Sequence, residues 1–193
     1  KDVGKISAEG YVDGHGQDIQ SAFVNISSIE YKNNVLSNIE ISGNFLQKQL
    51  SFSLVSNDNL LQTGINGMIN FNQSETEYTL AANIDYANLS ELNIFRKDSN
   101  AIVSASGIIV DLMGNKLENL KGKIEIIDLT YRENDKTFPL NDMRLSIESS
   151  DNMDKNLNFT SSTLSINANG NFSYLEIAPV VQNVLNNYLP HAI

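Results

Sequence analysis

The side chains best suited to proton transfer or metal binding are few. The two histidines are His15, which lies in a glycine-rich turn, and His191, which lies near the end of the chain. An imidazole can act as a general base or as a metal ligand when other groups converge on it. These two positions instead favour solvent exposure, and we expect neither a catalytic role nor a metal at either histidine.

Two segments offer oxygen ligands at a spacing typical of calcium sites. They are Asn57–Asn59 and Asp151–Asp154. A calcium-binding loop of the EF-hand type also needs a central glycine and a closing glutamate within about 12 residues. Neither segment continues in that way, so we expect both to be polar hairpin turns.

Other catalytic motifs are also missing. The chain has no cysteine, which excludes thiolate nucleophiles and thiolate metal sites. Its glycines, such as Gly14, Gly16, Gly114 and Gly122, do not form a GxGxxG pattern before a helix, and no GxSxG occurs. The sequence therefore predicts a protein that is not an enzyme and that has no cofactor.

Composition and charge limit the classes of molecule that this protein can be expected to bind. Hydrophobic residues make up 41% of the 193 residues and charged residues 19%, as in ordinary folded chains. The formal net charge of -10 repels phosphate backbones, so no nucleic acid is expected. No apolar run approaches the roughly 18 residues of a membrane span, and the KDVGKIS start has no leader. We expect either a soluble protein or a fragment, and the strand so close to the start favours a fragment.

Apolar and polar residues alternate over most of the chain, which predicts strands. Asn, Asp, Gly and Ser cluster between the alternating runs, as expected of hairpin turns. In one run, Val24 and Ile26 should face one side and Ile29 the other. We expect about ten to twelve antiparallel strands. In the first half they are predicted at Lys5–Val12, Ala22–Tyr31, Leu36–Ser42, Leu50–Val55, Ile65–Phe71 and Tyr78–Tyr86.

Two segments break the alternation. Leu89, Leu92 and Phe95 suggest a helical turn or an irregular apolar plug. At the end of the chain, apolar residues from Ile177 to Tyr188 recur with helical spacing. They predict an amphipathic helix that packs across one end of the sheet.

Five segments of the first half recur in the same order roughly 100 residues later, a spacing at which each copy must be a group of strands. The pairs are ISAEG and VSASG, FVNISSIEY and KIEIIDLTY, LSNIEIS and LNDMRLS, KQLSF and KNLNF, and GMINF and GNFSY. We therefore predict one continuous domain made of a first β repeat (1–71), a connecting strand and plug (72–100), a second β repeat (101–175) and a helix (176–190).

Two architectures can use these strands. A β-sandwich, which is common for an all-β chain of this length, buries one face of each sheet against the other. A single elongated, curved, antiparallel-rich sheet would instead fold its apolar face into a groove. The repeat favours the groove, because similar groups of strands extend a sheet along one axis, and the β-sandwich remains the alternative.

The order of small, apolar and glycine positions resembles the TamB-type (AsmA-like) translocation and assembly proteins, most of all those of Bacteroidota. The likeness covers most of the chain and is strongest after Ala81. The residues that occupy the family's positions are Gly107, Leu117, Leu120, Gly122, Tyr131, Leu140, Leu157, Ser161, Gly170 and Phe172.

This resemblance implies an internal slice of a periplasmic bridge that is anchored in the inner membrane by a segment outside this chain. Such proteins are elongated apolar β-grooves ("β-tacos"). They are implicated in moving phospholipid to the outer membrane and in assembling outer-membrane proteins with a BamA- or TamA-related partner. The expected ligands are therefore phospholipid acyl chains.

The role of the in-phase apolar residues differs between the two architectures. In a sandwich they would form the closed core, whereas in a groove they would line a wall that binds lipid. The resemblance favours the wall. The candidate groove residues are Ile6, Val24, Ile26, Ile39, Ile41, Phe52, Leu54, Ile69, Val103, Ile124, Ile126, Leu145, Phe159, Leu164 and Ile166. The alternative function is a cell-surface β-sandwich adhesin or glycan-binding module. Glycan platforms need exposed Trp or Tyr, and the chain has no Trp.

Overall fold

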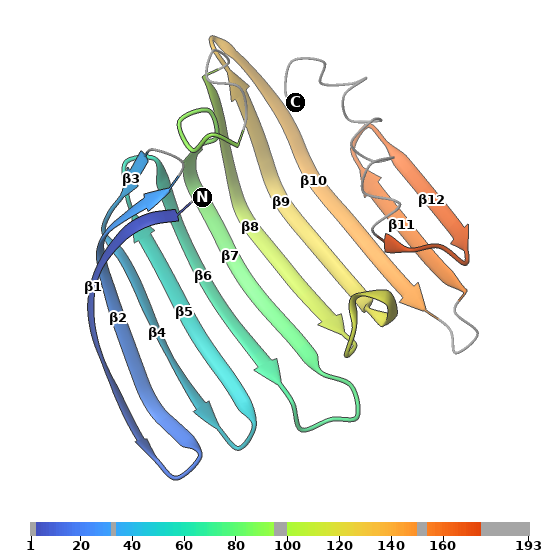
Figure 1. Cartoon of the computed structure of the whole chain (residues 1–193). Coiled ribbons are helices and arrows are strands. Elements are labelled where there is room, and N and C mark those ends of the chain that lie inside the picture. Colours follow the sequence, from blue (N-terminus) through green and yellow to red (C-terminus); the bar gives the residue numbers. More distant parts are fainter. Residues whose placement is uncertain (1–2, 32–33, 95–99, 150–153, 175–193) are drawn as a thin grey trace.

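The computed structural model describes residues 3–31, 34–94, 100–149 and 154–174, and all of its strands belong to one sheet (Figure 1). The alternating runs of the sequence form these strands, because a side-chain period of two matches the pleat. Their bounds are β1 Val3–His15, β2 Asp18–Tyr31, β3 Asn34–Leu36, β4 Ile39–Leu46, β5 Gln49–Asn57, β6 Leu61–Asn70, β7 Glu77–Asn88, β8 Ala101–Met113, β9 Lys121–Glu133, β10 Lys136–Ser149, β11 Lys155–Ser161 and β12 Ser165–Gly170.

Strand order in the sheet follows the order in the chain. The path runs β1-β2-β4-β5-β6-β7-β8-β9-β10-β11-β12, neighbouring strands along it pair antiparallel, and β3 pairs with β2 at the side of this path. The prediction of a mainly β, antiparallel fold of about ten to twelve strands is confirmed by this sheet of 12 strands. The described strands do not divide into two sheets, so the β-sandwich alternative is wrong. The predicted helix at 176–190 lies outside the described residues.

One face of the sheet is apolar. Residues paired across antiparallel strands project from the same face, so the pairings define rows of side chains that cross the sheet. One such row contains Val12, Ala22, Gly43, Phe52, Gly67, Leu80, Val110, Ile124, Leu145, Phe159 and Ile166. A second contains Ile19, Phe45, Leu50, Ile69, Tyr78, Leu112, Gly122, Ile147, Leu157 and Ala168.

The opposite face is polar. Its rows come from the alternate residues of the same strands. One of them contains Asn44, Ser51, Met68, Thr79, Asp111, Lys123, Ser146, Asn158 and Asn167. The sheet is thus a single layer with one polar face and one apolar face.

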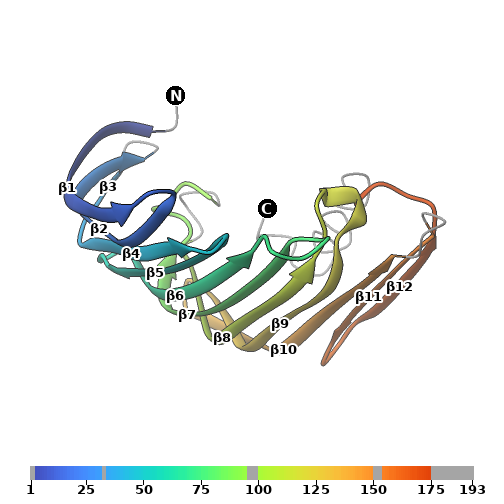
Figure 2. The ribbon, with the colours of Figure 1, turned by 90° about the horizontal axis from the view of Figure 1, so that it is seen from below.

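The sheet is curved, and Figure 2 shows its two outer parts, at β1–β3 and at β11–β12, rising on the same side. The segment that follows β7 lies on that concave side. Its Leu92 is buried and packs with Leu36 and Ile39, and Ile41 and Leu54 pack against the same cluster. Because Ile41 and Leu54 belong to the apolar face, the apolar face is the concave one.

Leu92, in the segment predicted to be a helical turn or an apolar plug, is 5% exposed. The amide of Leu92 donates to the Asn88 carbonyl at 2.9 Å, and that of Ile94 donates to the Leu89 carbonyl at 2.9 Å, so the chain makes a compact turn here. Leu89 packs instead against a second small cluster, formed by Ala101 and Tyr131. Phe95 lies outside the described residues.

Two local features depart from simple alternation. The β1–β2 pairing changes register between Ser7 and Ala8, which adds a residue on β2 and brings Ile29 to the same cluster as Ile26. The prediction that Ile29 faces away from Ile26 was therefore wrong. The predicted strand Leu36–Ser42 is also interrupted, between the end of β3 and the start of β4 at Ile39.

The buried carboxylate of Asp58 holds that interruption in place. Its Oδ2 accepts hydrogen bonds from the Ser37 amide at 2.7 Å and the Ser37 hydroxyl at 2.9 Å. Its Oδ1 accepts from the Leu60 amide at 2.7 Å. Asn57–Asn59 is therefore a polar turn, as predicted.

A short 3-10 helix, η2 at Leu117–Asn119, lies between β8 and β9. Across the described part of the chain, no helix has the length and apolar character that a membrane crossing requires.

Candidate functional site: the apolar face and the charged hollow at its rim

Most of the predicted groove residues lie together on the concave apolar face. The cross-strand pairings place the following twelve on it: Val24, Ile26, Ile39, Ile41, Phe52, Leu54, Ile69, Ile124, Ile126, Leu145, Phe159 and Ile166. The other three are peripheral. Ile6 pairs with Ile29 near the β1 edge, Val103 packs against the Ala101–Tyr131 cluster, and Leu164 lies in the β11–β12 turn.

These side chains are partly buried, with the exception of Ile39, which is buried at 9% exposure, and of Ile6, which is 58% exposed. A single-layer sheet gives each residue neighbours beside it but none above it. Among the described residues, the turn that carries Leu92 covers one part of this face, and η2 and the segment after β12 contact it at Lys155. The strands themselves form one layer, with no second sheet over the rest of the face. The face is therefore a large, contiguous apolar surface, of the kind that marks a binding site in soluble domains.

A hollow of about 190 Å³ lies on this face between β2, β4 and β5. Small residues create the depth, because Ala22 and Gly43 leave room beside larger neighbours. The ring of Phe52 lies over Gly67, where an added Cβ would overlap it. The hollow is lined by Ile19, Ala22, Val24, Ile41, Ser42, Gly43, Asn44, Phe45, Leu50 and Phe52.

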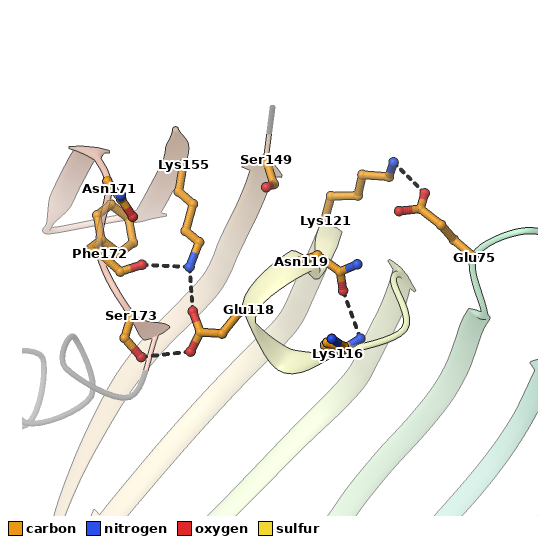
Figure 3. A pocket seen from close by; sticks show the side chains of 10 residues that line it. All are labelled: Glu75, Lys116, Glu118, Asn119, Lys121, Ser149, Lys155, Asn171, Phe172 and Ser173. Carbon is orange, nitrogen blue, oxygen red and sulfur yellow. Dashed lines mark hydrogen bonds and ion pairs between the residues drawn. The ribbon is translucent and has the colours of Figure 1, made fainter. Parts of the chain in front are cut away.

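A larger hollow, of about 570 Å³, lies at the strand ends between β7 and β12 (Figure 3). Its wall is formed by five segments: the loop before β7, the turn around η2, the end of β10, the start of β11 and the segment after β12. It is lined by Glu75, Lys116, Glu118, Asn119, Lys121, Ser149, Lys155, Asn171, Phe172 and Ser173.

Lys155 is the best-buried charge of this hollow, with 5% of the residue exposed. Its Nζ lies 2.5 Å from Glu118 Oε2 and donates to the Phe172 carbonyl oxygen at 2.6 Å. The same ammonium lies 4.3 Å from the centre of the Tyr174 ring, within cation–π range. The first residue of β11 is thus joined to η2 and to the segment that follows β12.

Further contacts attach that segment to η2. The Ser173 hydroxyl donates to Glu118 Oε1 at 2.7 Å, and the Tyr174 hydroxyl donates to the Leu120 carbonyl at 3.1 Å. The hydrogen bond from Lys155, followed by that from Ser173, lowers the pKa of Glu118 below its ordinary value of 4.5. Burial, followed by the charge of Glu118, raises the pKa of Tyr174.

Glu118→Gln is expected to make the stability of the folded protein less dependent on pH in the acidic range. A carboxyl group whose pKa is lowered by folding stabilises the folded state above its unfolded pKa, near 4.5. That contribution disappears as the pH falls from about 4.5 through the lower folded-state pKa. Thermal melts from pH 7 to pH 3 should therefore show a stability difference between the wild type and the Gln variant that shrinks below pH 4.5. A difference that is constant across this range would contradict the prediction.

The other chemically capable residues do not assemble into a site. His15 is exposed at the end of β1, and Asp58 is engaged in its turn. Within the described ranges, no group of three or more His, Asp or Glu side chains could hold a metal ion. His191 and residues 151–153 lie outside those ranges.

Sequence reasoning missed the charged hollow. One signal was available, because Lys155 is in phase with Leu157 and Phe159 along KNLNF, which places a cation on the apolar face of β11. Its partner Glu118 is distant in the sequence and could not be inferred from spacing.

Comparison with family models, with curated proteins and with solved structures gave no significant match. The sheet and its two hollows therefore have to be interpreted from their own geometry.

Proposed function

We propose that this chain is a non-enzymatic segment of a periplasmic bridge protein. In this proposal its concave apolar face is a groove, built from two β repeats, that carries phospholipid acyl chains toward the outer membrane. A role in outer-membrane protein assembly belongs to the same proposal, with a BamA- or TamA-related partner bound through parts outside this chain. The resemblance to TamB-type proteins motivates it.

One structural observation supports the proposal most strongly. Apolar rows cross the sheet from β2 to β12 on a concave face, and most of their members are only partly buried, although Ile147 and Leu157 are buried. From β2 to β12 the path has ten strands and nine spacings. At about 4.8 Å per spacing, a row that crosses them is about 43 Å long. A surface of this length exceeds what a compact core would leave uncovered.

The physical chemistry suits acyl chains. Each CH2 group moved from water to an apolar wall gains about 0.8 kcal/mol, without any need for directional contacts. The sheet supplies such a wall while its backbone hydrogen bonds are satisfied in the ladder. The polar opposite face stays in water, so a chain can be bound on one side only.

Photo-crosslinking in cells tests the proposal. A photoreactive side chain at position 52 or 126, which projects from the apolar face, should capture phospholipid. The matched controls are positions 53 and 125, where Ser53 and Glu125 project from the opposite face of the same strands. We expect at least about a tenfold excess of lipid adduct at the apolar positions.

Equal capture on the two faces, or no lipid adduct at positions 52 and 126 in a correctly folded protein, would argue against a lipid groove. Capture of a polypeptide in place of lipid at the same positions would indicate a peptide-binding face.

A further inference from the structure

We infer that the charged hollow at the rim, lined by Lys116, Lys121 and Lys155, binds the phosphate of an amphiphile whose acyl chain lies on the apolar face. This inference rests on the proposed function and adds a headgroup site to it. The first observation behind it is position. Ser149 and Lys155 pair with each other, and they continue the apolar row in which Ile147 pairs with Leu157. The hollow therefore begins two residues, or about 7 Å, beyond that row.

The second observation is charge. Three ammonium groups and two carboxylates line the hollow, although the whole chain has a formal net charge of -10. Both carboxylates are already paired, because Lys121 Nζ lies 2.6 Å from Glu75 Oε2 and Lys155 pairs with Glu118. Among the described residues, no carboxylate lies within ion-pair distance of Lys116. The lining thus has one positive charge in excess.

The third observation is that the wall is built in advance. Lys155 is held by Glu118, by the Phe172 carbonyl and by the Tyr174 ring, so its ammonium has a defined position before any ligand arrives. The amide of Lys116 donates to Asn119 Oδ1 at 2.8 Å, which places the start of the η2 turn. Figure 3 shows Lys155 with Glu118 on one side of the hollow and Lys121 with Glu75 on the other.

These contacts suit a phosphate monoester or diester better than a neutral headgroup. Lys116 and Lys121 can approach phosphate oxygens with charge-assisted hydrogen bonds, and Ser149 and Asn171 add neutral donors. The excess charge is small and partly exposed, so we expect a moderate, salt-sensitive preference.

Titration calorimetry with two amphiphiles of equal chain length tests the inference. Dodecyl phosphate should bind about three- to tenfold more tightly than dodecyl maltoside at low salt, and the ratio should fall as salt is added. The double variant Lys116→Gln/Lys121→Gln should remove this preference and leave maltoside binding unchanged. The control Lys48→Gln/Lys136→Gln, which makes the same charge change at exposed positions elsewhere, should retain the preference.

Equal binding of the two amphiphiles by the wild type would overturn the headgroup site while leaving the acyl groove intact. A preference that survives in the Lys116/Lys121 variant would also overturn it. Failure of both amphiphiles to bind would defeat the proposed function itself. Inorganic phosphate that binds as tightly as dodecyl phosphate would identify a free-anion site and contradict the link to a lipid.

Discussion

Ile108→Asp is expected to lower the affinity of the chain for a phospholipid probe by tenfold or more, whereas Ile109→Asp should change it less than about twofold. The two isoleucines are adjacent in β8 and project from opposite faces. Ile108 pairs with Ala82 and Ile126 in an apolar row. A carboxylate there would have to lose water when an acyl chain covers it, at a cost of at least the roughly 1.4 kcal/mol that a tenfold loss requires.

The neighbouring position makes a close control. Ile109 is 38% exposed and pairs with Ala81 and Glu125 on the polar face. A carboxylate at position 109 would lie opposite Glu125, whose charge is compensated by Arg144 Nε at 3.0 Å, and it would stay in water. Both variants introduce the same charge into the same strand.

The measurement is binding of a fluorescent phospholipid analogue, with circular dichroism to confirm that each variant keeps its β structure. Ile108→Val, which retains an apolar side chain, should bind within about twofold of the wild type. If Ile108→Asp folds and binds lipid normally, the apolar face is not the ligand-binding face.

Gly122→Ala is expected to lower the free energy of unfolding by about 2–5 kcal/mol, a large effect for the addition of one methyl group. Gly122 has a φ of 131°, which L residues rarely adopt. An added Cβ would also overlap the Asp111 carbonyl oxygen of the neighbouring strand. Backbone atoms in a paired ladder cannot move aside without breaking hydrogen bonds.

Gly170→Ala separates the two causes. Gly170 has nearly the same φ, 136°, but an added Cβ would meet nothing within 4 Å. Its cost should be limited to the backbone strain, about 1–3 kcal/mol. Urea denaturation of both variants measures the difference. If Gly122→Ala lowered the free energy of unfolding no more than Gly170→Ala, the backbone of β8 would have to move away from the added methyl group at little energetic cost.

The sequence predicted the sheet well where strands pair without interruption. Phe52 and Leu54 lie in β5, whose pairing with β4 and β6 has no register shift. The alternation of side chains along β5 therefore gives the correct face for each residue. Ile29 was misplaced because the bulge depends on how β2 pairs with β1, and alternation along one strand contains no information about its partner.

The rim was harder to predict for a different reason. Lys155 has the sequence context of a surface lysine after a polar turn, and its burial depends on Glu118 and Phe172, which reach it from other elements. The break between β3 and β4 likewise depends on Asp58, which bonds to Ser37 across 21 residues. The internal repeat stays a prediction, and the helix at 176–190 lies outside the described residues.

The sequential strand order has a consequence for how such a chain can fold and change in length. Because each strand other than β3 pairs with the strands that precede and follow it along the path, every hairpin is a local nucleus from which pairing can spread in either direction. Removing a whole hairpin would keep the direction of every remaining strand, so its apolar and polar sides would stay in phase. Removing a single strand would reverse the direction of all that follow. Growth of this sheet over evolutionary time is therefore expected in pairs of strands, with the spacing between apolar rows preserved at each step.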